Sequence, residues 1–210
     1  MTAAVPVSRI APQRSRAEAL VADHLHAIDT PLASLRNASG QIARWGVTLA
    51  QRLSAGGRLL VAGNGGSAAE AQHLTAELVG RFDGNRPAYS AIALTSETSS
   101  LTAIGNDYGF EDVFARQVEA HGRRGDILLL LSTSGRSPNL LTAAHAARRS
   151  HLTSWAITGA APNPLARAVD DALVLEGASP SIQEVELVAI HALCRAFDDA
   201  VGFGGGACES

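Results

Sequence analysis

The chain has 210 residues, of which 46% are hydrophobic, and a formal net charge of −3. This length is enough for one sizeable core, or for a core with a helical appendage. The weak negative charge argues against nucleic acid or an anionic membrane as the main partner, and the longest apolar run, 127–131, is too short to cross a bilayer. Cys194 and Cys208 provide no disulfide framework, and the first residues contain no signal-peptide core, so we expect a cytoplasmic protein.

The N-terminal quarter of the chain is predicted to be helical. Residues 1–14 form a flexible arm in this interpretation, and apolar residues then recur at helical spacing from residue 15 to about residue 53. Pro31 lies inside this stretch and marks either the start of a second helix or a bend between two helices. We therefore expect an N-terminal helical extension before the main fold.

From residue 57 onward, short apolar runs alternate with helical segments. The strand-like runs are 59–61, 91–94, 127–131, 154–157 and 172–175. This alternation is typical of an α/β fold with a parallel sheet. A strongly amphipathic helix is expected over 182–201, followed by a flexible tail at 202–210. Residues 15–201 are thus predicted to form a single domain with its helical extension.

Two loops rich in glycine and serine follow two of the strand-like runs. The first is Gly63-Asn64-Gly65-Gly66-Ser67, and the second is Ser132-Thr133-Ser134-Gly135, with Ser137 and Pro138 close behind. Ligands of open parallel sheets bind beyond the carboxyl ends of the strands, where loop amides and helix N-termini favour anions. Two such loops predict one phosphorylated ligand held from both sides.

The serines of these loops also have a purely structural interpretation. Ser67 followed by Glu70 fits a capping box, and Ser137 followed by Pro138 fits an N-cap with proline at the first helical position. A single case of this kind would favour a cap alone. The pair of loops favours anion binding, because together they offer more small donors and glycines than two turns require.

Four polar residues are candidates for chemistry beside this ligand. His73 and Glu77 have i,i+4 spacing and share one helix face, which is also the pattern of a surface pair that stabilises a helix. Gln183 and His191 lie on the last predicted helix, where a histidine among apolar residues is usually a core residue. Two histidines, a glutamate and a glutamine could form a zinc site or an acid–base pair, and spacing alone leaves both open. Cys194 has no nearby cysteine and is expected to fill the core.

In combination, these motifs resemble the phosphoheptose isomerases, or sedoheptulose 7-phosphate isomerases, of the sugar isomerase (SIS) domain superfamily. The resemblance covers about residues 20–201 and also includes Arg86-Pro87, Gly105-Asn106-Asp107 and Ile182-Gln183-Glu184. It implies a flavodoxin-like, five-stranded parallel sheet flanked by helices, and a homotetramer. The implied reaction converts D-sedoheptulose 7-phosphate to D-glycero-D-manno-heptose 7-phosphate through an enediol, as the first step of nucleotide-activated heptose biosynthesis.

The resemblance also assigns residues. It implies one Zn²⁺ per subunit, no nucleotide cofactor, and Glu77 and His191 as the acid–base pair. The implied metal ligands are His73, Glu77, Gln183 and His191. The implied substrate-binding residues are Asn64, Gly65, Gly66, Ser67, Glu77, Asn106, Asp107, Ser132, Thr133, Ser134, Ser137 and Gln183. One position departs from the family, whose members often carry an arginine immediately before Ile-Gln-Glu, where this chain has Ser181.

Two alternatives remain beside this interpretation. The chain could be a non-catalytic SIS protein, similar to the replication-initiator-associated DiaA, or an isomerase of another sugar phosphate. Non-catalytic members tend to lose the acid–base residues, whereas Glu77 and His191 are both present here.

The predicted metal set also raises a geometric question. On one straight helix Gln183 and His191 are about 12 Å apart along the axis, which is too far for easy coordination of one ion. We therefore expect either a site completed between subunits or a Gln183 that precedes the helix.

Overall fold

The computed structural model describes residues 15–203, and within them five parallel strands form one sheet in the order β2-β1-β3-β4-β5. The strands are β1 (Leu59–Gly63), β2 (Ala91–Ala93), β3 (Ile127–Ser132), β4 (Thr153–Thr158) and β5 (Asp171–Val174). This is the flavodoxin-like order, with its switch point between β1 and β3. The predicted fold class and all five predicted strands are confirmed.

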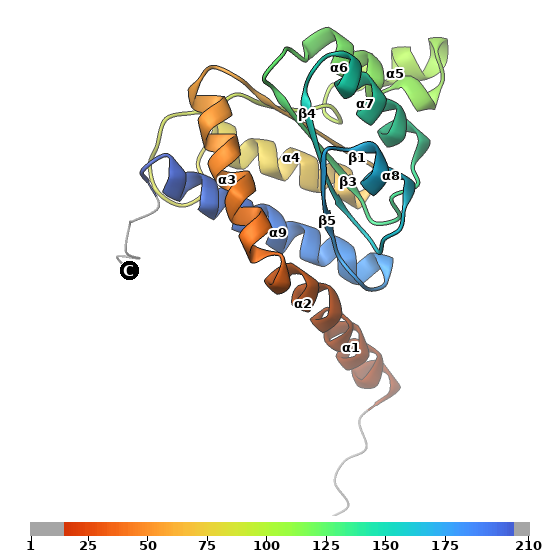
Figure 1. Ribbon diagram of the computed structural model, residues 1–210. Coiled ribbons are helices and arrows are strands. Elements are labelled where there is room, and N and C mark those ends of the chain that lie inside the picture. Colours follow the sequence, from red (N-terminus) through yellow and green to blue (C-terminus); the bar gives the residue numbers. More distant parts are fainter. Residues whose placement is uncertain (1–14, 204–210) are drawn as a thin grey trace, which may run out of the picture.

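Helices cover both faces of the sheet (Figure 1). The helical elements are α1 (Arg16–Ala27), α2 (Asp29–Asn37), α3 (Ser39–Ser54), α4 (Gly66–Val79), α5 (Thr98–Asp107), η1 (Phe110–Asp112), α6 (Ala115–His121), α7 (Pro138–Arg149), α8 (Pro164–Ala168) and α9 (Ser179–Ala200). Helices α3, α4 and α9 share one core with one face of the sheet, and α6, α7 and α8 share a second core with the other. Both faces of the sheet are apolar, and two helical layers are needed to bury them.

The central strand shows how one sequence serves both cores. All six residues of β3 are buried. Leu129 and Leu131 belong to the core beneath α3, α4 and α9, whereas Leu128 and Leu130 belong to the core beneath α6 and α7. Successive side chains of a strand point to opposite faces, so a continuous apolar run is required where both faces are covered.

The N-terminal helices leave the body of the molecule as a rod (Figure 1). Pro31 lies in the first turn of α2, as one of the two predictions for it proposed. A further break at Ala38 separates α2 from α3 and was not predicted. The weak helix formers around it, Asn37, Ser39 and Gly40, account for the break. None of the described helices is long and apolar enough to cross a membrane.

Candidate functional site

The first loop joins β1 to α4 at the carboxyl edge of the sheet. Gly65 is the N-cap of α4 and has φ 59°, a left-handed conformation that glycine adopts without strain. Gly66 begins the helix, and a Cβ atom there would collide with the side chain of Gln183, the fifth residue of α9. The loop therefore needs both glycines, and its amide groups stay open to a ligand.

The second loop joins β3 to α7 and lies beside the first, because Gly63 pairs with Leu131 in the sheet. Gly135 has φ 60°, and a Cβ atom there would overlap the side chain of Asn163. Ser132 Oγ accepts a hydrogen bond from the Gly135 amide at 3.1 Å, and Ser134 Oγ accepts one from the Arg136 amide at 3.2 Å. The hydroxyls thus shape a tight loop at the N-terminus of α7.

A cavity of about 380 Å³ lies between Asn64 of the first loop, the start of α7 and η1. It is lined by Asn64, Phe110, Glu111, Ser137, Pro138 and Asn139. The side-chain amides of Asn64 and Asn139 bond each other reciprocally at 3.0 and 2.9 Å, which ties the first loop to α7. Sequence reasoning missed Asn139, which is buried and whose only signal was its place one residue after Pro138.

The predicted capping roles of the serines are wrong at Ser67 and incomplete at Ser137. Helix α4 begins at Gly66, so Ser67 is inside its first turn, where it cannot be the N-cap. The buried Ser67 hydroxyl instead donates to Glu186 Oε2 on α9 at 2.7 Å. Ser137 is the N-cap residue of α7, but its side chain makes no capping bond. Its hydroxyl is therefore free to contact a ligand in the cavity that it lines.

Two carboxyl groups lie behind the first loop, the buried Glu186 and the half-buried Glu70. Burial raises the pKa of Glu186 to about 8, with the hydrogen bond from Ser67 acting against this rise and the charge of Glu70 adding to it. Burial also raises the pKa of Glu70 to about 7. Glu186 Oε1 and Glu70 Oε2 have no hydrogen-bond partner among the described residues. Such groups favour the neutral form at neutral pH, because an unpaired buried charge is expensive.

Further along α4, three residues meet as the sequence predicted. His73 Nε2 lies 2.9 Å from His191 Nε2, and 3.2 Å from Glu77 Oε1. One ligand atom from each of the three lies within 4.8 Å of the other two. Helices α4 and α9 pack side by side in one core, which brings His191 to His73 across 118 residues of sequence. His191 is therefore not a core histidine, and the pair at i,i+4 is not a simple surface pair.

The chemistry of this cluster fits a zinc ion. Two imidazole nitrogens and one carboxylate oxygen are a common ligand set of catalytic zinc, which keeps one further position open. Zn–N and Zn–O bonds of about 2.0–2.1 Å at tetrahedral angles place neighbouring donor atoms about 3.3 Å apart. The two distances in the cluster are close to that value. Without an ion, one imidazole must donate to the other, so the cluster also suits a pair of groups that exchange a proton.

Arg86 holds the helix segment that carries Glu77. Its guanidinium donates to the carbonyl oxygens of Glu77 and Leu78, at 2.6 and 2.9 Å, and its Nε pairs with Asp198 Oδ1 at 2.7 Å. The pair is buried and joins the C-terminal end of α4 to α9. The sequence motif contained Arg86 but gave it no role, and only the fold shows that it positions Glu77.

Three predicted residues lie apart from this cluster within the chain. Gln183 is in the continuous helix α9 and lies against Gly66, two turns before His191. The alternative expectation, a Gln183 that precedes the helix, is therefore wrong. Asn106 and Asp107 end α5, where Asn106 Nδ2 donates to Asp107 Oδ1 at 2.7 Å.

Two other predicted positions are also placed by the fold. Thr133 is half-buried. Its backbone carbonyl packs so closely on Gly159 that a Cβ atom on residue 159 would not fit. Ser181, where the family often has arginine, is buried in the first turn of α9. The position thus offers no exposed cation to a substrate.

Comparison with known proteins agrees with this architecture. The family model described as SIS domain matches residues 24–159. The fold and the two loops at the carboxyl edge thus define a SIS domain protein.

Named relatives narrow the class further. The phosphoheptose isomerase of Streptomyces coelicolor is 56% identical over 185 residues, which are 88% of this chain and 80% of the relative. The solved phosphoheptose isomerase of Francisella tularensis has a TM-score of 0.80 at 33% identity and covers 88% of this chain and 100% of its own. The solved phosphoheptose isomerase of Neisseria gonorrhoeae has a TM-score of 0.79 at 37% identity and covers 87% of this chain and 99% of its own. The chain belongs to the phosphoheptose isomerase family, as its motifs predicted.

Proposed function

We propose that the protein is an aldose–ketose isomerase that converts D-sedoheptulose 7-phosphate to D-glycero-D-manno-heptose 7-phosphate. The observation that carries this proposal is the cluster of His73, Glu77 and His191, on the helices α4 and α9 that also border the first loop. The relatives that cover most of this chain are named phosphoheptose isomerases, which supports the same substrate class. The product is the starting compound for nucleotide-activated heptoses.

The reaction moves one proton between adjacent carbons. Glu77 removes a proton from C1 of the ketose, and the electron pair of that bond forms the enediol. The same carboxyl group then delivers a proton to C2, which gives the aldose. A carboxylate is a suitable base for this step. The backbone carbonyl of Glu77 accepts a hydrogen bond from Arg86, which fixes the position of the residue before the substrate arrives.

The oxygen atoms exchange a proton in the opposite direction. His191 donates a proton to the C2 carbonyl oxygen and accepts one from the C1 hydroxyl, and its Nε2 atom faces that of His73 at 2.9 Å. Zn²⁺ held by His73, Glu77 and His191 would polarise the carbonyl oxygen when bound. No nucleotide cofactor enters this scheme, because no hydride leaves the substrate.

The phosphate group supplies binding energy at a distance from the reacting carbons. We infer that the amides of Gly65 and Gly66, with the hydroxyls of Thr133, Ser134 and Ser137, hold it at the N-termini of α4 and α7. Such a site needs no arginine, because backbone dipoles and hydroxyls supply the donors.

We infer that the complete site forms between subunits of a homo-oligomer, for which we expect a tetramer. His73 lies seven residues beyond Gly66 along α4, which is about 10 Å, and Glu77 lies about 16 Å beyond it. Within one chain, the two phosphate-binding loops are thus too far from the histidine–glutamate cluster for a single sugar phosphate to reach both. The exposed side chains of Leu20, Val21 and Leu25 on α1 support association with another copy. In such an assembly, Gln183 of a second copy would be the fourth zinc ligand.

The remaining assignments follow from this function. Residues 15–201 would constitute one SIS domain with a helical extension, while the predicted arm 1–14 and most of the predicted tail 202–210 lie outside the described residues. We infer a cytoplasmic location, because sugar phosphates are made there and the two cysteines give no disulfide framework.

The direct test is an assay of the purified protein with D-sedoheptulose 7-phosphate, in which formation of the aldose is followed. Fructose 6-phosphate, a ketose phosphate with a shorter carbon chain, is the control substrate. We expect turnover of the heptulose phosphate, with zinc found by elemental analysis in the wild type and lost in His73→Asn. No aldose from the heptulose phosphate would overturn the proposal.

Mixed assembly tests the shared site. Glu77→Gln subunits are co-assembled with subunits that carry Thr133→Ala and Ser134→Ala. We expect recovered activity, because a hybrid site would combine the intact loop of the first kind of subunit with the intact cluster of the second. Co-assembly of Glu77→Gln with His191→Ala is the control and should give no recovery, because both residues belong to the same cluster of one chain. Equal results from both mixtures would contradict a shared site.

A further inference from the structure

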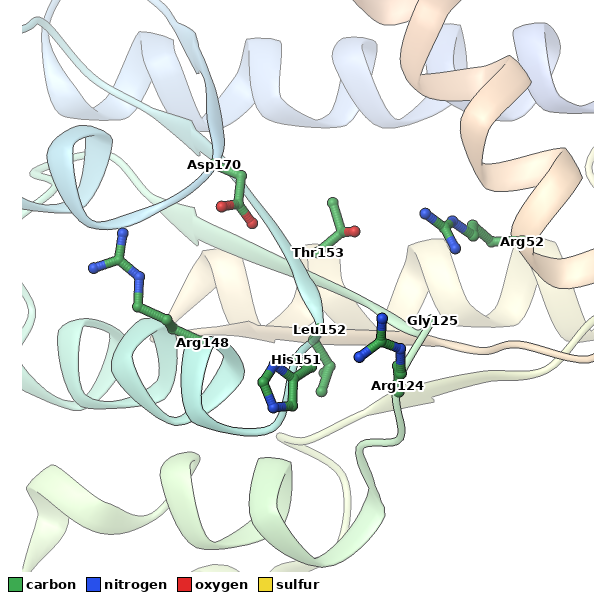
Figure 2. Close-up of a pocket in the computed structure, with 8 residues that line it drawn as sticks. All are labelled: Arg52, Arg124, Gly125, Arg148, His151, Leu152, Thr153 and Asp170. Carbon is green, nitrogen blue, oxygen red and sulfur yellow. The ribbon is translucent and has the colours of Figure 1, made fainter.

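A second concave site lies at the amino edge of the sheet, opposite the two loops. A cavity of about 360 Å³ is lined by Arg52, Arg124, Gly125, Arg148, His151, Leu152, Thr153 and Asp170 (Figure 2). Arg52 lies near the end of α3, which precedes β1, and Arg124 directly precedes β3. Arg148 lies in the last turn of α7, which precedes β4. The site is thus built from segments that enter three neighbouring strands.

An adjoining cavity extends this site along the same edge. It has a volume of about 310 Å³ and shares Arg52, Arg124 and Gly125 with the first. Arg58 and Arg123 are added to the lining there. Arginines thus line two adjoining hollows, which also contain Asp170 and Asp126, although the chain as a whole has a net charge of −3.

Among the described residues, the three arginines of the first cavity have no acidic partner. Within residues 15–203, the guanidinium groups of Arg52, Arg124 and Arg148 form no ion pair. The acid in the lining, Asp170, accepts two hydrogen bonds at Oδ2, from the amide and the hydroxyl of Ser154 at 2.8 and 2.9 Å. With one aspartate against three arginines, the lining keeps an excess of positive charge.

Two arginines close to the cavity do form ion pairs with carboxylates. Arg149, one residue after Arg148, pairs with Glu119 at 2.6 Å. Arg58 lies 3.6 Å from the buried Asp126. Arg52, Arg124 and Arg148 thus differ from these two neighbours, which have carboxylate partners in the described part of the chain.

The helix ends give these arginines no structural task either. Cations near a helix C-terminus can stabilise its last carbonyl groups. Here the backbone already does so at α3, where the amides of Ala55 and Gly57 donate to the carbonyls of Gln51 and Arg52, at 3.2 and 2.9 Å. At α7 the amide of Leu152 donates to the carbonyl of Ala147 at 2.9 Å. The guanidinium groups remain available for a ligand.

We propose that this arginine-lined site binds a small molecule that carries a diphosphate group. Guanidinium groups bind phosphate oxygens in a bidentate way, and arginine is the preferred residue where planar recognition of phosphate matters. Two adjoining hollows that share Arg52 and Arg124 fit two linked anionic groups better than one. The volumes lie within the range of small-molecule sites. The ligand is distinct from the monophosphate proposed for the opposite edge.

Calorimetric titration of the purified protein tests this proposal. The probes are inorganic diphosphate and ADP, with inorganic phosphate as the single-group reference. We expect saturable binding of diphosphate that is at least about 10-fold tighter than that of phosphate and weakens as salt is raised. If inorganic diphosphate and ADP both bind, the site recognises the diphosphate group wherever it is attached. If only inorganic diphosphate binds, the ligand is the free anion.

A matched pair of double variants locates the binding. Arg52→Gln with Arg148→Gln removes two cavity arginines, and Arg44→Gln with Arg149→Gln removes two arginines from the same two helices outside the cavity. We expect the first to weaken diphosphate binding at least about 10-fold and the second to change it less than about 3-fold. Arg124→Gln, in an exposed loop, provides a second variant should the first fail to fold.

Two results would overturn the proposal. One is the absence of saturable diphosphate binding to the wild type, and the other is equal binding by the two double variants. Binding is measured without sugar phosphate, so its failure is distinguishable from failure of the proposed isomerase activity.

Discussion

The two edges of the sheet use different chemistry toward anions. At the carboxyl edge, glycine amides and serine or threonine hydroxyls are arranged around two helix N-termini, and the loops contain no arginine before Arg136. At the amino edge, three arginines that form no ion pair within residues 15–203 line a cavity. The first arrangement fixes an anion by shape and short contacts, whereas the second attracts one by charge. The difference shows that a parallel sheet can offer an anion site at either edge, by different means.

Pairing decides what an arginine does in this fold. Arg86→Gln is expected to have the largest effect on stability, about 3–5 kcal/mol in the free energy of unfolding, because it leaves Asp198 buried without its partner. Arg52→Gln should change that free energy by less than about 0.5 kcal/mol, because its guanidinium is exposed. Denaturant unfolding of both variants is the measurement. Equal losses would contradict the distinction between paired and unpaired arginines.

Glu77→Gln tests the chemistry of the histidine–glutamate cluster. The variant keeps the shape of the side chain but removes the base, so kcat should fall by a factor of about 10² or more. The fold should persist, because Arg86 contacts the backbone carbonyl of Glu77 and not its side chain. Steady-state kinetics with thermal denaturation is the measurement. Glu119→Gln, which removes a carboxylate on α6, is the control, and similar rates for both variants would remove Glu77 from the base role.

Glu186→Gln sharpens the description of the buried carboxyl groups behind the first loop. The pKa of Glu186 is raised by burial from 4.5 to about 8, so the folded state binds a proton that the unfolded state has released between those values. The contribution of this group to stability is therefore full below about pH 4.5 and declines as the pH rises toward about 8.

Glutamine has no such proton to lose. The free energy of unfolding of Glu186→Gln, relative to the wild type, should rise by on the order of 2 kcal/mol between about pH 5.5 and about pH 7.5. Denaturant titrations of both proteins at the two pH values provide the measurement. A difference that stays constant with pH would show that the carboxyl group is not held neutral.

Ser134→Ala tests the carboxyl edge with the smallest change. The exposed hydroxyl should contribute one hydrogen bond to phosphate, so KM should rise by about 10-fold while the free energy of unfolding changes by less than about 0.5 kcal/mol. Arg52→Gln is the control at the other edge and should leave KM for the sugar phosphate within about twofold. A loss of stability with unchanged KM would make Ser134 a structural residue of the loop only.

The sequence predicted the sheet well because its signals are local. The apolar runs around Leu59 and Ile127 are strands by composition, and the alternation with helices indicates a parallel arrangement. The break at Ala38 was missed, because the low helix propensity of the residues around it is a weak guide to where a helix ends.

The site was predicted in part. The spacing of His73 and Glu77 placed them on one helix face, but only the packing of α4 against α9 could bring His191 to them. The partner of Ser67 was missed for the same reason. A capping box is a local pattern, whereas the bond to Glu186 spans 119 residues. The arginine-lined cavity likewise consists of residues that are unremarkable in the sequence and meet only at the edge of the sheet.

The most direct test of the proposed function is the isomerisation of D-sedoheptulose 7-phosphate in D₂O, followed by nuclear magnetic resonance. A proton taken by Glu77 can exchange with solvent before it is returned, so we expect an aldose 7-phosphate that carries deuterium at C2. We also expect slow loss of the C1 proton signal from the remaining ketose. Formation of no aldose, with the ketose protons unchanged in the presence of protein and zinc, would contradict the assignment of this chain as a phosphoheptose isomerase.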